Sequence, residues 1–344
     1  MISHHAFVAA VAAAIRAPSL HNSQPWRFRR YRDEIHVLAD PSRTPPVADA
    51  GGWATRIACG AATYNLQLAF AADGQPMAVH WRPDANEPWL MAVLRPTEPW
   101  PPTPHQLRLF RAIPRRHSNR RPFLPRPVPV EVRLAMVAAA CEEGAWIDLV
   151  VGAIAAAAVS EITHAASRVL HRNQAYTAEL ASWIRRDRAN AHPDGAADPG
   201  TGRSAVDADL SDLEADTSDL LPPCPLSDLV RGAAPNLADD PLIAVLGTAG
   251  DTHRDQLHAG FALQRVLLTI TDHGLSSSLL SQPIEVPSAR EQLRIALGRY
   301  GTPQMVLRVG YAEPASPTPR RPVAEVIEAS VDGPTDPSTR ALRP

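Results

Sequence analysis

The spacing of apolar residues predicts helices and strands over the first hundred residues. Apolar positions recur every three or four residues over 4–16 and 59–74, which is typical of helices, and a glycine ends the second of them. The stretch WRFRRYRDEIHVLAD, residues 26–40, alternates instead around a charged turn at 32–34. It predicts a hairpin of two strands.

Both patterns continue after residue 105. Helical and strand patterns follow one another there, and this mixture indicates an α+β or α/β protein. The helices are expected over 129–144, 161–187 and 259–274, and the strands over 145–152, 241–249 and 302–312.

Two of the predicted helices carry glycines at matching places. Gly60 and Gly74 have the same separation as Gly260 and Gly274, and apolar residues fill the interval in both helices. A repeated structural unit leaves marks of this kind in a sequence. The pattern favours an internal duplication, which we take as a hypothesis.

Proline and low-complexity composition mark the boundaries between parts of the chain. The run PTEPWPPTP, residues 96–104, cannot form a helix or a central strand and predicts an extended connector. We expect an N-terminal half over 1–104, a C-terminal half over 105–325 and a tail over 326–344. Gly, Pro, Asp and Ser dominate 189–235, which is either a solvated, partly disordered insertion or a mobile lid over an active site.

Composition narrows the classes of partner. The 344 residues are 45% hydrophobic with a net charge of −2, and no apolar run reaches the ~20 residues that cross a bilayer. We therefore expect a cytoplasmic protein without nucleic-acid or membrane partners. The three cysteines lie far apart without metal-ligand spacing, so no metal site is expected.

The absence of lysine limits the possible chemistry. All 34 basic residues are arginines, which excludes a phosphate-binding loop lysine and a Schiff-base lysine. Any phosphate must be held by Arg side chains, hydroxyls, backbone N–H groups or helix N-termini. The GxGxxG, HExxH and GxSxG motifs are also missing, so no motif in the sequence indicates a dinucleotide-binding protein, a zinc protease or a hydrolase of these classes.

Two polar stretches remain as candidate sites. RRHSNRRPF, residues 115–123, holds four Arg, one Ser and one Asn, which fits either a solvated basic surface or an anion site. APSLHNSQPWRF, residues 17–28, breaks the first helix at Pro18 and is rich in hydrogen-bonding side chains. A capped turn explains its tryptophan, but a turn needs only one or two such polar residues.

These stretches resemble motifs of the flavin-dependent nitroreductase family. RRHSNRRPF resembles the family's RxSxR segment, and APSLHNSQPWRF resembles its PSxxNxQPW segment. SQPIEVP, residues 281–287, is similar to the PIEG-type turn beside the flavin ring, and RRP, residues 320–322, to the basic residues after the last strand. The resemblance spans residues 17–322 and implies an α+β, nitroreductase-like fold.

The order of the motifs differs from that of an ordinary family member. RxSxR usually comes first, and two subunits share each flavin site, whereas here the PSxxNxQPW-like segment precedes the RxSxR-like one. This layout resembles the Acg-like actinobacterial branch. It implies two related halves in one chain forming a pseudo-dimer, with one complete flavin site, so that a monomer suffices and further self-association stays open.

The resemblance implies FMN as the cofactor and a set of binding residues. Since the flavin carries the chemistry, no catalytic side chain and no metal are expected. Val286 stands where the family has a glycine, so this position departs from the family's pattern at the backbone approach to flavin N5. The residues expected to bind the phosphate are Arg116, Ser118 and Arg120, together with Arg320 or Arg321. Those expected to line the ring and the ribityl chain are Pro18, Ser19, Leu20 and Asn22. Those expected to contact the other ring face or the N5 edge are Pro283, Ile284, Glu285 and Val286.

Two activities follow as expectations from the resemblance. The first is NAD(P)H-dependent, two-electron reduction of nitro or quinone-like acceptors through FMN in a ping-pong cycle. The alternative is a protein that stores or sequesters flavin beneath a lid, with little or no reductase turnover.

Overall fold

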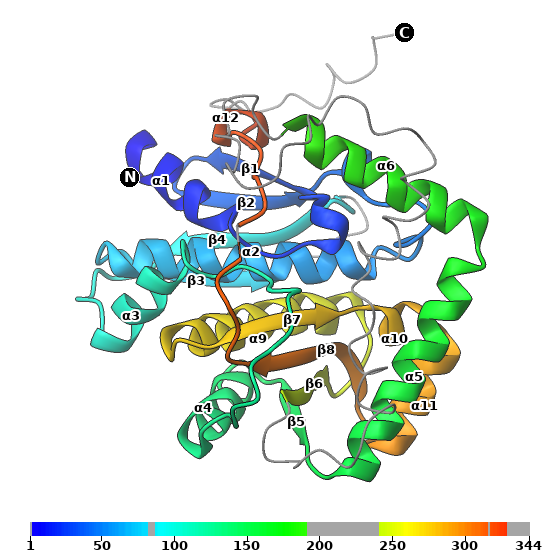
Figure 1. Ribbon diagram of the computed structural model, residues 1–344. Coiled ribbons are helices and arrows are strands. Elements are labelled where there is room, and N and C mark those ends of the chain that lie inside the picture. Colours follow the sequence, from blue (N-terminus) through cyan, green and yellow to red (C-terminus); the bar gives the residue numbers. More distant parts are fainter. Residues whose placement is uncertain (1, 82–86, 191–240, 316, 329–344) are drawn as a thin grey trace, which may run out of the picture.

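The computed structural model describes residues 2–81, 87–190, 241–315 and 317–328. These residues form two four-stranded antiparallel sheets, with a pair of helices side by side between them (Figure 1). Apart from its first two residues, the predicted insertion at 189–235 lies outside the described residues, as does the predicted tail beyond residue 328.

The first sheet is built from residues before the proline-rich connector. Its strand order is β1-β2-β4-β3, and its core contains Phe7, Trp26, Phe28 and Leu66. The elements are α1 (His4–Ala14), the 3-10 turns η1 (Leu20–Asn22) and η2 (Pro41–Arg43), β1 (Trp26–Tyr31), β2 (Glu34–Ala39), α2 (Trp53–Ala72), β3 (Met77–Trp81) and β4 (Leu90–Pro96).

The second sheet follows the connector and the helix α3 (Pro104–Ala112). Its strand order is β5-β6-β8-β7, and all seven residues of β6 are buried. The elements are α4 (Val130–Cys141), β5 (Trp146–Val150), α5 (Ala153–His171), α6 (Gln174–Asn190), β6 (Leu242–Thr248), α9 (His253–Asp272), β7 (Ser276–Leu280), α10 (Gln282–Glu285), α11 (Pro287–Ala296), β8 (Thr302–Gly310) and α12 (Val323–Val326).

The two sheets share one arrangement of strands. In each, the first strand pairs with the second, the second with the fourth, and the fourth with the third. The pairing of the second and fourth strands carries a register shift in both sheets, between Val37 and Leu38 in one and between Leu246 and Gly247 in the other. The repeat inferred from glycine spacing therefore coincides with a repeat in topology.

Glycine allows the two central helices to touch. A Cβ added at Gly60 would lie 2.1 Å from the Leu257 carbonyl oxygen, and one added at Gly260 would lie 2.0 Å from that of Ile57. Each glycine thus faces the residue three positions before the other, as in a contact around a two-fold axis. Helices α2 and α9 cross at a distance that no larger residue permits.

The segment 323–328 crosses back to the first sheet. Val326 is fully buried in the first core, and Ile327 forms a parallel bridge with Phe28 at the edge of β1. A backbone N–H of Glu328 also donates to the Phe28 carbonyl. Residues 326–328, placed in the tail by the sequence, are therefore part of the folded first half.

The structure differs from the predicted elements at several points. The helix expected over 161–187 is two helices, α5 and α6. The helix is interrupted at Asn173, whose Oδ1 accepts hydrogen bonds from the Ala175 and Tyr176 N–H groups and so begins α6. SQPIEVP contains the short helix α10 rather than an open turn. The strands β3, β4 and β7 and the helices α3 and α11 were not predicted.

Among the described residues, no helix is both long enough and apolar enough to cross a membrane.

Candidate functional site

A cavity of about 480 Å³ lies between the two halves of the chain. Pockets that bury a small organic ligand have volumes of this order. Both halves contribute to the wall, through segments that are far apart in the sequence. The lining residues come from the loop at 18–22, the start of α2, the segment 116–121, α6, α9, the end of β7, β8 and the segment 315–320.

One part of the cavity wall is basic. Four arginines line it and no carboxylate does, among the residues that the structure describes. Positive charge gathered on one part of a cavity wall favours an anionic ligand. The arginines are Arg116, Arg120, Arg121 and Arg320, and the hydroxyl side chains of Ser118 and Thr318 lie in the wall with them.

Arg116 is the most deeply buried of these cations. Its residue is 5% exposed, and its Nη2 donates to the Arg16 carbonyl over 3.0 Å. Its Nε and Nη1 are buried without a hydrogen-bond partner. Burial lowers the pKa of Arg116 to about 9, and the charges of Arg320 and Arg16 act in the same direction. Two donor nitrogens without a partner on a buried cation favour binding of an anion at this position.

The segment around Ser118 is fixed to the edge of the second sheet. Ser118 forms a parallel bridge with Ser277 of β7, and the Asn119 N–H donates to the Ser277 carbonyl over 2.8 Å. The buried Asn119 side chain donates to the Glu313 carbonyl over 2.7 Å. The sheet therefore sets the direction in which Arg116, Ser118 and Arg120 leave the backbone.

The loop that carries the first motif is strained. His21, Asn22 and Gln24 all have φ near +50°, a left-handed conformation that residues other than glycine seldom adopt. Such strain persists only where surrounding contacts hold it, and it clusters at ligand sites. In this loop the Gln24 N–H donates to Ser19 Oγ, and Gln24 Oε1 accepts from the Arg321 N–H.

Arg320 joins this loop to the described segment that follows β8. Its Nε donates to the Ile15 carbonyl over 2.9 Å and its Nη1 to Asn22 Oδ1 over 3.0 Å. Asn22 Nδ2 in turn donates to the Pro319 carbonyl. Arg320 and Asn22 therefore hold the loop and the C-terminal segment together, besides facing the cavity.

An apolar surface forms another part of the wall. It combines residues of α2 from the first half with residues of α9, β7 and β8 from the second. A flat aromatic group would bury its faces against such a surface. The residues are Ala54, Ile57, Ala58, Leu263, Leu279, Leu280 and Met305.

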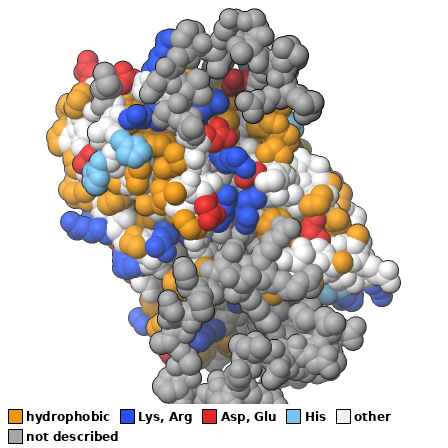
Figure 2. Space-filling model, turned by 90° about the horizontal axis from the view of Figure 1, so that it is seen from above, with side chains coloured by type: hydrophobic (Ala, Val, Ile, Leu, Met, Phe, Trp, Pro, Cys, Tyr) orange, Lys and Arg blue, Asp and Glu red, His pale blue; other side chains and the backbone are white. Residues whose placement is uncertain are grey.

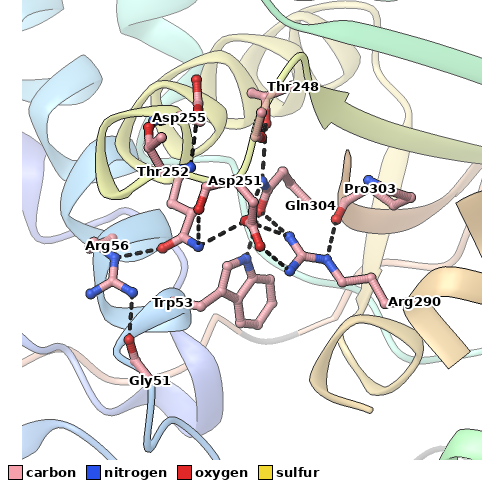
Figure 3. Close-up of polar contacts among 12 residues, drawn as sticks. Gly51, Trp53, Arg56, Thr248, Asp251, Thr252, Asp255, Arg290, Pro303 and Gln304 are labelled. Carbon is pink, nitrogen blue, oxygen red and sulfur yellow. Dashed lines mark hydrogen bonds and ion pairs between the residues drawn. The ribbon is translucent and has the colours of Figure 1, made fainter. Parts of the chain in front are cut away.

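Trp53, at the start of α2, is held in the wall by a polar network. Its Nε1 donates to Gln304 Oε1 over 2.8 Å, and Gln304 is fully buried (Figure 3). Arg290 donates to the same oxygen and forms an ion pair with Asp251. Gln304 Nε2 completes the network by donating to Thr248 Oγ1. The second half therefore fixes the orientation of an indole that belongs to the first.

Helix α6 also borders the cavity, through Tyr176, Leu180 and Ile184. It belongs to the second half but is attached to the first, because Glu179 accepts hydrogen bonds from the N–H groups of Val47 and Ala48 over 2.8 and 2.9 Å. Figure 1 shows α6 rising from α5 toward the first sheet. The helix bridges the two halves where the cavity lies.

Most of the predicted site residues meet at this cavity. Those that line it are Pro18, Ser19, Leu20, Asn22, Arg116, Ser118, Arg120 and Arg320. Pro283 to Val286 do not line it, because α10 turns Pro283 and Ile284 into the core, and Ser281 and Gln282 form the wall instead. Arg321 also lies outside the lining, and its side chain donates to the Glu325 carbonyl.

Sequence reasoning missed several lining residues. Trp53 lies before the helix predicted over 59–74, and Tyr176 lies within the amphipathic helix predicted over 161–187, so no local signal marked either as a site residue. Gln282 was inside a quoted motif, and Thr318 lies just before the RRP stretch, so both could have been found there. His21, also inside a quoted motif, lines the cavity, and burial and Arg120 lower its pKa to about 4.

Metal binding finds no support among the described residues, where no group of three His, Cys, Asp or Glu side chains could hold an ion. Of the cysteines among the described residues, Cys59 is buried and Cys141 is exposed. Seen from above, the coloured part of the surface, which belongs to the described residues, mixes hydrophobic, basic and acidic side chains (Figure 2).

These features define an α+β protein with a ligand cavity between two similar sheets. The model of the "Nitroreductase family" matches residues 113–311, more than half of the chain. The chain belongs to the nitroreductase family, and its fold is the nitroreductase-like α+β fold. The match begins just before the RRHSNRRPF stretch and does not include the first sheet.

Relatives in Mycobacterium tuberculosis match nearly the whole chain. Identity is 31% over 334 residues with "Putative NAD(P)H nitroreductase Rv3131", covering 92% of this chain and 89% of the relative. It is 30% over 343 residues with "Putative NAD(P)H nitroreductase acg", covering 95% and 96%. The crystal structure of the FMN-dependent nitroreductase NfnB from Mycobacterium smegmatis in complex with NADPH has a TM-score of 0.43 and 19% identity, covering 65% of this chain and 98% of that one.

Proposed function

We propose that the cavity binds FMN and that the protein uses it to pass two electrons from NAD(P)H to a nitro or quinone-like acceptor. The observation that carries this proposal is the buried guanidinium of Arg116 at the basic part of the cavity, whose Nε and Nη1 have no hydrogen-bond partner. FMN carries a phosphate with about two negative charges and an apolar, planar ring. Family membership and the names of the mycobacterial relatives point the same way.

The residues present fit this cofactor. Arg116 Nε and Nη1 would donate to the phosphate, and Ser118 Oγ and the Arg120 guanidinium would add further donors. The apolar surface around Ile57 and Leu279 would bury the ring, because aromatic groups gain most from leaving water. When bound, FMN would supply the hydride chemistry, so the side chains need only bind, orient and exclude water.

The proposal includes a pseudo-dimer in which the two halves complete one site. The RxSxR-like segment from the second half and the PSxxNxQPW-like segment from the first both line the cavity. The shared strand order and the mutual contact of Gly60 and Gly260 support an origin from two equivalent units. One chain would therefore suffice for one flavin.

Aromatic side chains pack at the matching position on the other side of the helix pair, which supports one flavin for each chain. When the two halves are aligned so that Gly60 matches Gly260, Ala58 in the cavity wall corresponds to His258. The matching strands likewise relate Leu280, at the end of β7, to Trp81 at the end of β3. The Trp81 ring centre lies 5.0 Å from that of His258 and 5.4 Å from that of Phe261. Aromatic rings packed at this position would leave no room for a second cofactor.

A second candidate function is sequestration of FMN with little turnover. The position of α6 favours it, because Tyr176, Leu180 and Ile184 line the cavity while Glu179 attaches the helix to the first half. A nicotinamide must reach the flavin ring to deliver a hydride. A helix held over the ring would hinder that approach.

Absorbance and anaerobic reduction test both candidates. The purified protein is expected to bind about one FMN for each chain, as one site shared by the two halves requires, and a colourless protein that ignores added FMN would refute both. Anaerobic NADPH is then expected to bleach the flavin band within seconds. A band that persists for minutes and yields only to dithionite would instead establish sequestration.

A further inference from the structure

Beside the cavity lies a pair of side chains for which FMN binding has no use. Tyr176 of α6 lines the cavity and is only 2% exposed. Behind it, both carboxyl oxygens of Glu285 are shielded from solvent, although Glu285 itself does not line the cavity. Neither oxygen has a hydrogen-bond partner among the described residues, and the Tyr176 hydroxyl and the Ser281 side chain lie close enough to act on the pKa of this carboxyl.

The surroundings of Glu285 favour its protonated form. Burial, together with the negative charges of Asp49 and Glu179, raises its pKa to about 7, against the opposing effect of the Ser281 and Tyr176 hydroxyls. Asp49 lies in the loop before α2 and Glu179 lies on α6. A carboxyl group with this pKa holds and releases a proton near neutral pH.

Tyr176 depends on the state of Glu285. Burial raises the pKa of the Tyr176 hydroxyl, and the negative charge of Glu285 raises it further. Protonation of Glu285 removes that charge, so the hydroxyl becomes a better proton donor when its neighbour carries a proton. His21, whose ring centre lies 6.0 Å from that of Tyr176, is neutral because of its low pKa.

We propose that Tyr176 donates a proton to the oxygen of the acceptor in the cavity and that Glu285 replaces that proton from behind. The inference rests on the proposed reductase function and extends it to acceptors whose oxygen is protonated on reduction, quinones above all. A quinone becomes a hydroquinone by gaining a hydride, which the reduced cofactor supplies, and one further proton. That proton leaves Tyr176 Oη, the Glu285 carboxyl returns one to the same oxygen, and solvent reprotonates the carboxylate.

Glu285 is a positioning residue in this scheme and Tyr176 is the catalytic one. The relay also makes turnover depend on pH. With Glu285 protonated only below about pH 7, reduction of a quinone is expected to slow as the pH rises through that value. The reaction of NADPH with the oxidised protein, which needs no proton from Tyr176, is expected to lack this dependence.

The decisive experiment reoxidises the reduced, FMN-loaded protein with two acceptors in a stopped-flow instrument. Benzoquinone needs the proton, whereas ferricyanide takes single electrons and needs none. Tyr176→Phe is expected to slow the benzoquinone reaction about 100-fold, the usual size of a lost general acid, and to leave the ferricyanide reaction unchanged. Tyr300→Phe, at a fully exposed tyrosine, is the matched control and is expected to change neither.

Two further measurements keep the test independent of that variant. In the wild-type protein, a solvent deuterium isotope effect is expected with benzoquinone and not with ferricyanide. The infrared band of a protonated carboxylic acid is expected to titrate near pH 7, with or without FMN, and to be missing in Glu285→Gln, whose quinone reaction should lose its pH dependence. Equal isotope effects with the two acceptors, or an unchanged pH profile in Glu285→Gln, would overturn the relay.

Failure of the relay and failure of the proposed function give different results. A protein that binds FMN and is bleached by NADPH, but reduces benzoquinone equally well with Phe at position 176, keeps the function and loses the relay. A protein that never binds FMN loses the function, and the infrared titration then still reports whether Glu285 holds a proton near neutral pH.

Discussion

Replacing Arg116 by Met is expected to weaken FMN binding at least about 100-fold while leaving the FMN-free protein folded. Removal of one partner from a buried, hydrogen-bonded charge pair costs about 2–5 kcal/mol of binding free energy, and about 2.7 kcal/mol already corresponds to 100-fold. The dissociation constant is measured from the quenching of flavin fluorescence. FMN affinity within a few-fold of the wild type would show that the phosphate binds elsewhere.

The same substitution is expected to raise the melting temperature of the FMN-free protein at neutral pH. Folding lowers the pKa of Arg116 from its usual 12.5 to about 9, so the charged form is destabilising at every pH below about 9. This cost disappears as the pH rises toward the unfolded pKa, and Met removes it at neutral pH. The opposite signs of the two effects separate a ligand-binding cation from a structural one.

Arg115→Met is the matched control for both measurements. Arg115 is the neighbouring residue with the same side chain, but it is exposed, and its Nε donates to the Arg111 carbonyl within the same surface turn. Its loss is expected to leave FMN affinity and melting temperature within experimental error. Equal effects of the two substitutions would mean that general charge, and not the buried guanidinium, attracts the flavin.

Replacing Gly260 by Ala is expected to destabilise the protein by about 2–4 kcal/mol, although alanine is normally about 1 kcal/mol better than glycine inside a helix. The added Cβ would meet the Ile57 carbonyl at 2.0 Å, and a backbone atom cannot rotate away as a side chain can. Helices α2 and α9 must therefore separate. The free energy of unfolding is measured by urea denaturation.

The reciprocal variant Gly60→Ala is expected to behave alike, since its Cβ would lie 2.1 Å from the Leu257 carbonyl oxygen. Once one substitution has forced the helices apart, the second meets a wider gap, so the double variant is expected to lose less than the sum. Gly51→Ala, where nothing lies within 4 Å, is the control. A gain in stability at Gly260 would disprove the tight crossing.

The sequence anticipated the parts of the site that carry local signals. Breakers and polar runs marked the loop at 18–22 and the segment around Ser118, and glycine spacing marked the two central helices. In each case the feature that makes the prediction possible is a residue type within the segment itself. Pro18 ends a helix, Arg116 and Arg120 are the phosphate-binding residue type, and Gly74 and Gly274 both take φ of +75° just past a helix end.

Only the tertiary structure decided which distant residues share the cavity. Trp53 faces it because Gln304, on a strand of the other half, holds its indole, and Tyr176 faces it because the chain breaks at Asn173 and sends α6 back across the first half. Conversely, α10 buries Pro283 and Ile284 behind the wall. Periodicity along a chain reports which face of an element is buried, but packing between elements determines what that face meets.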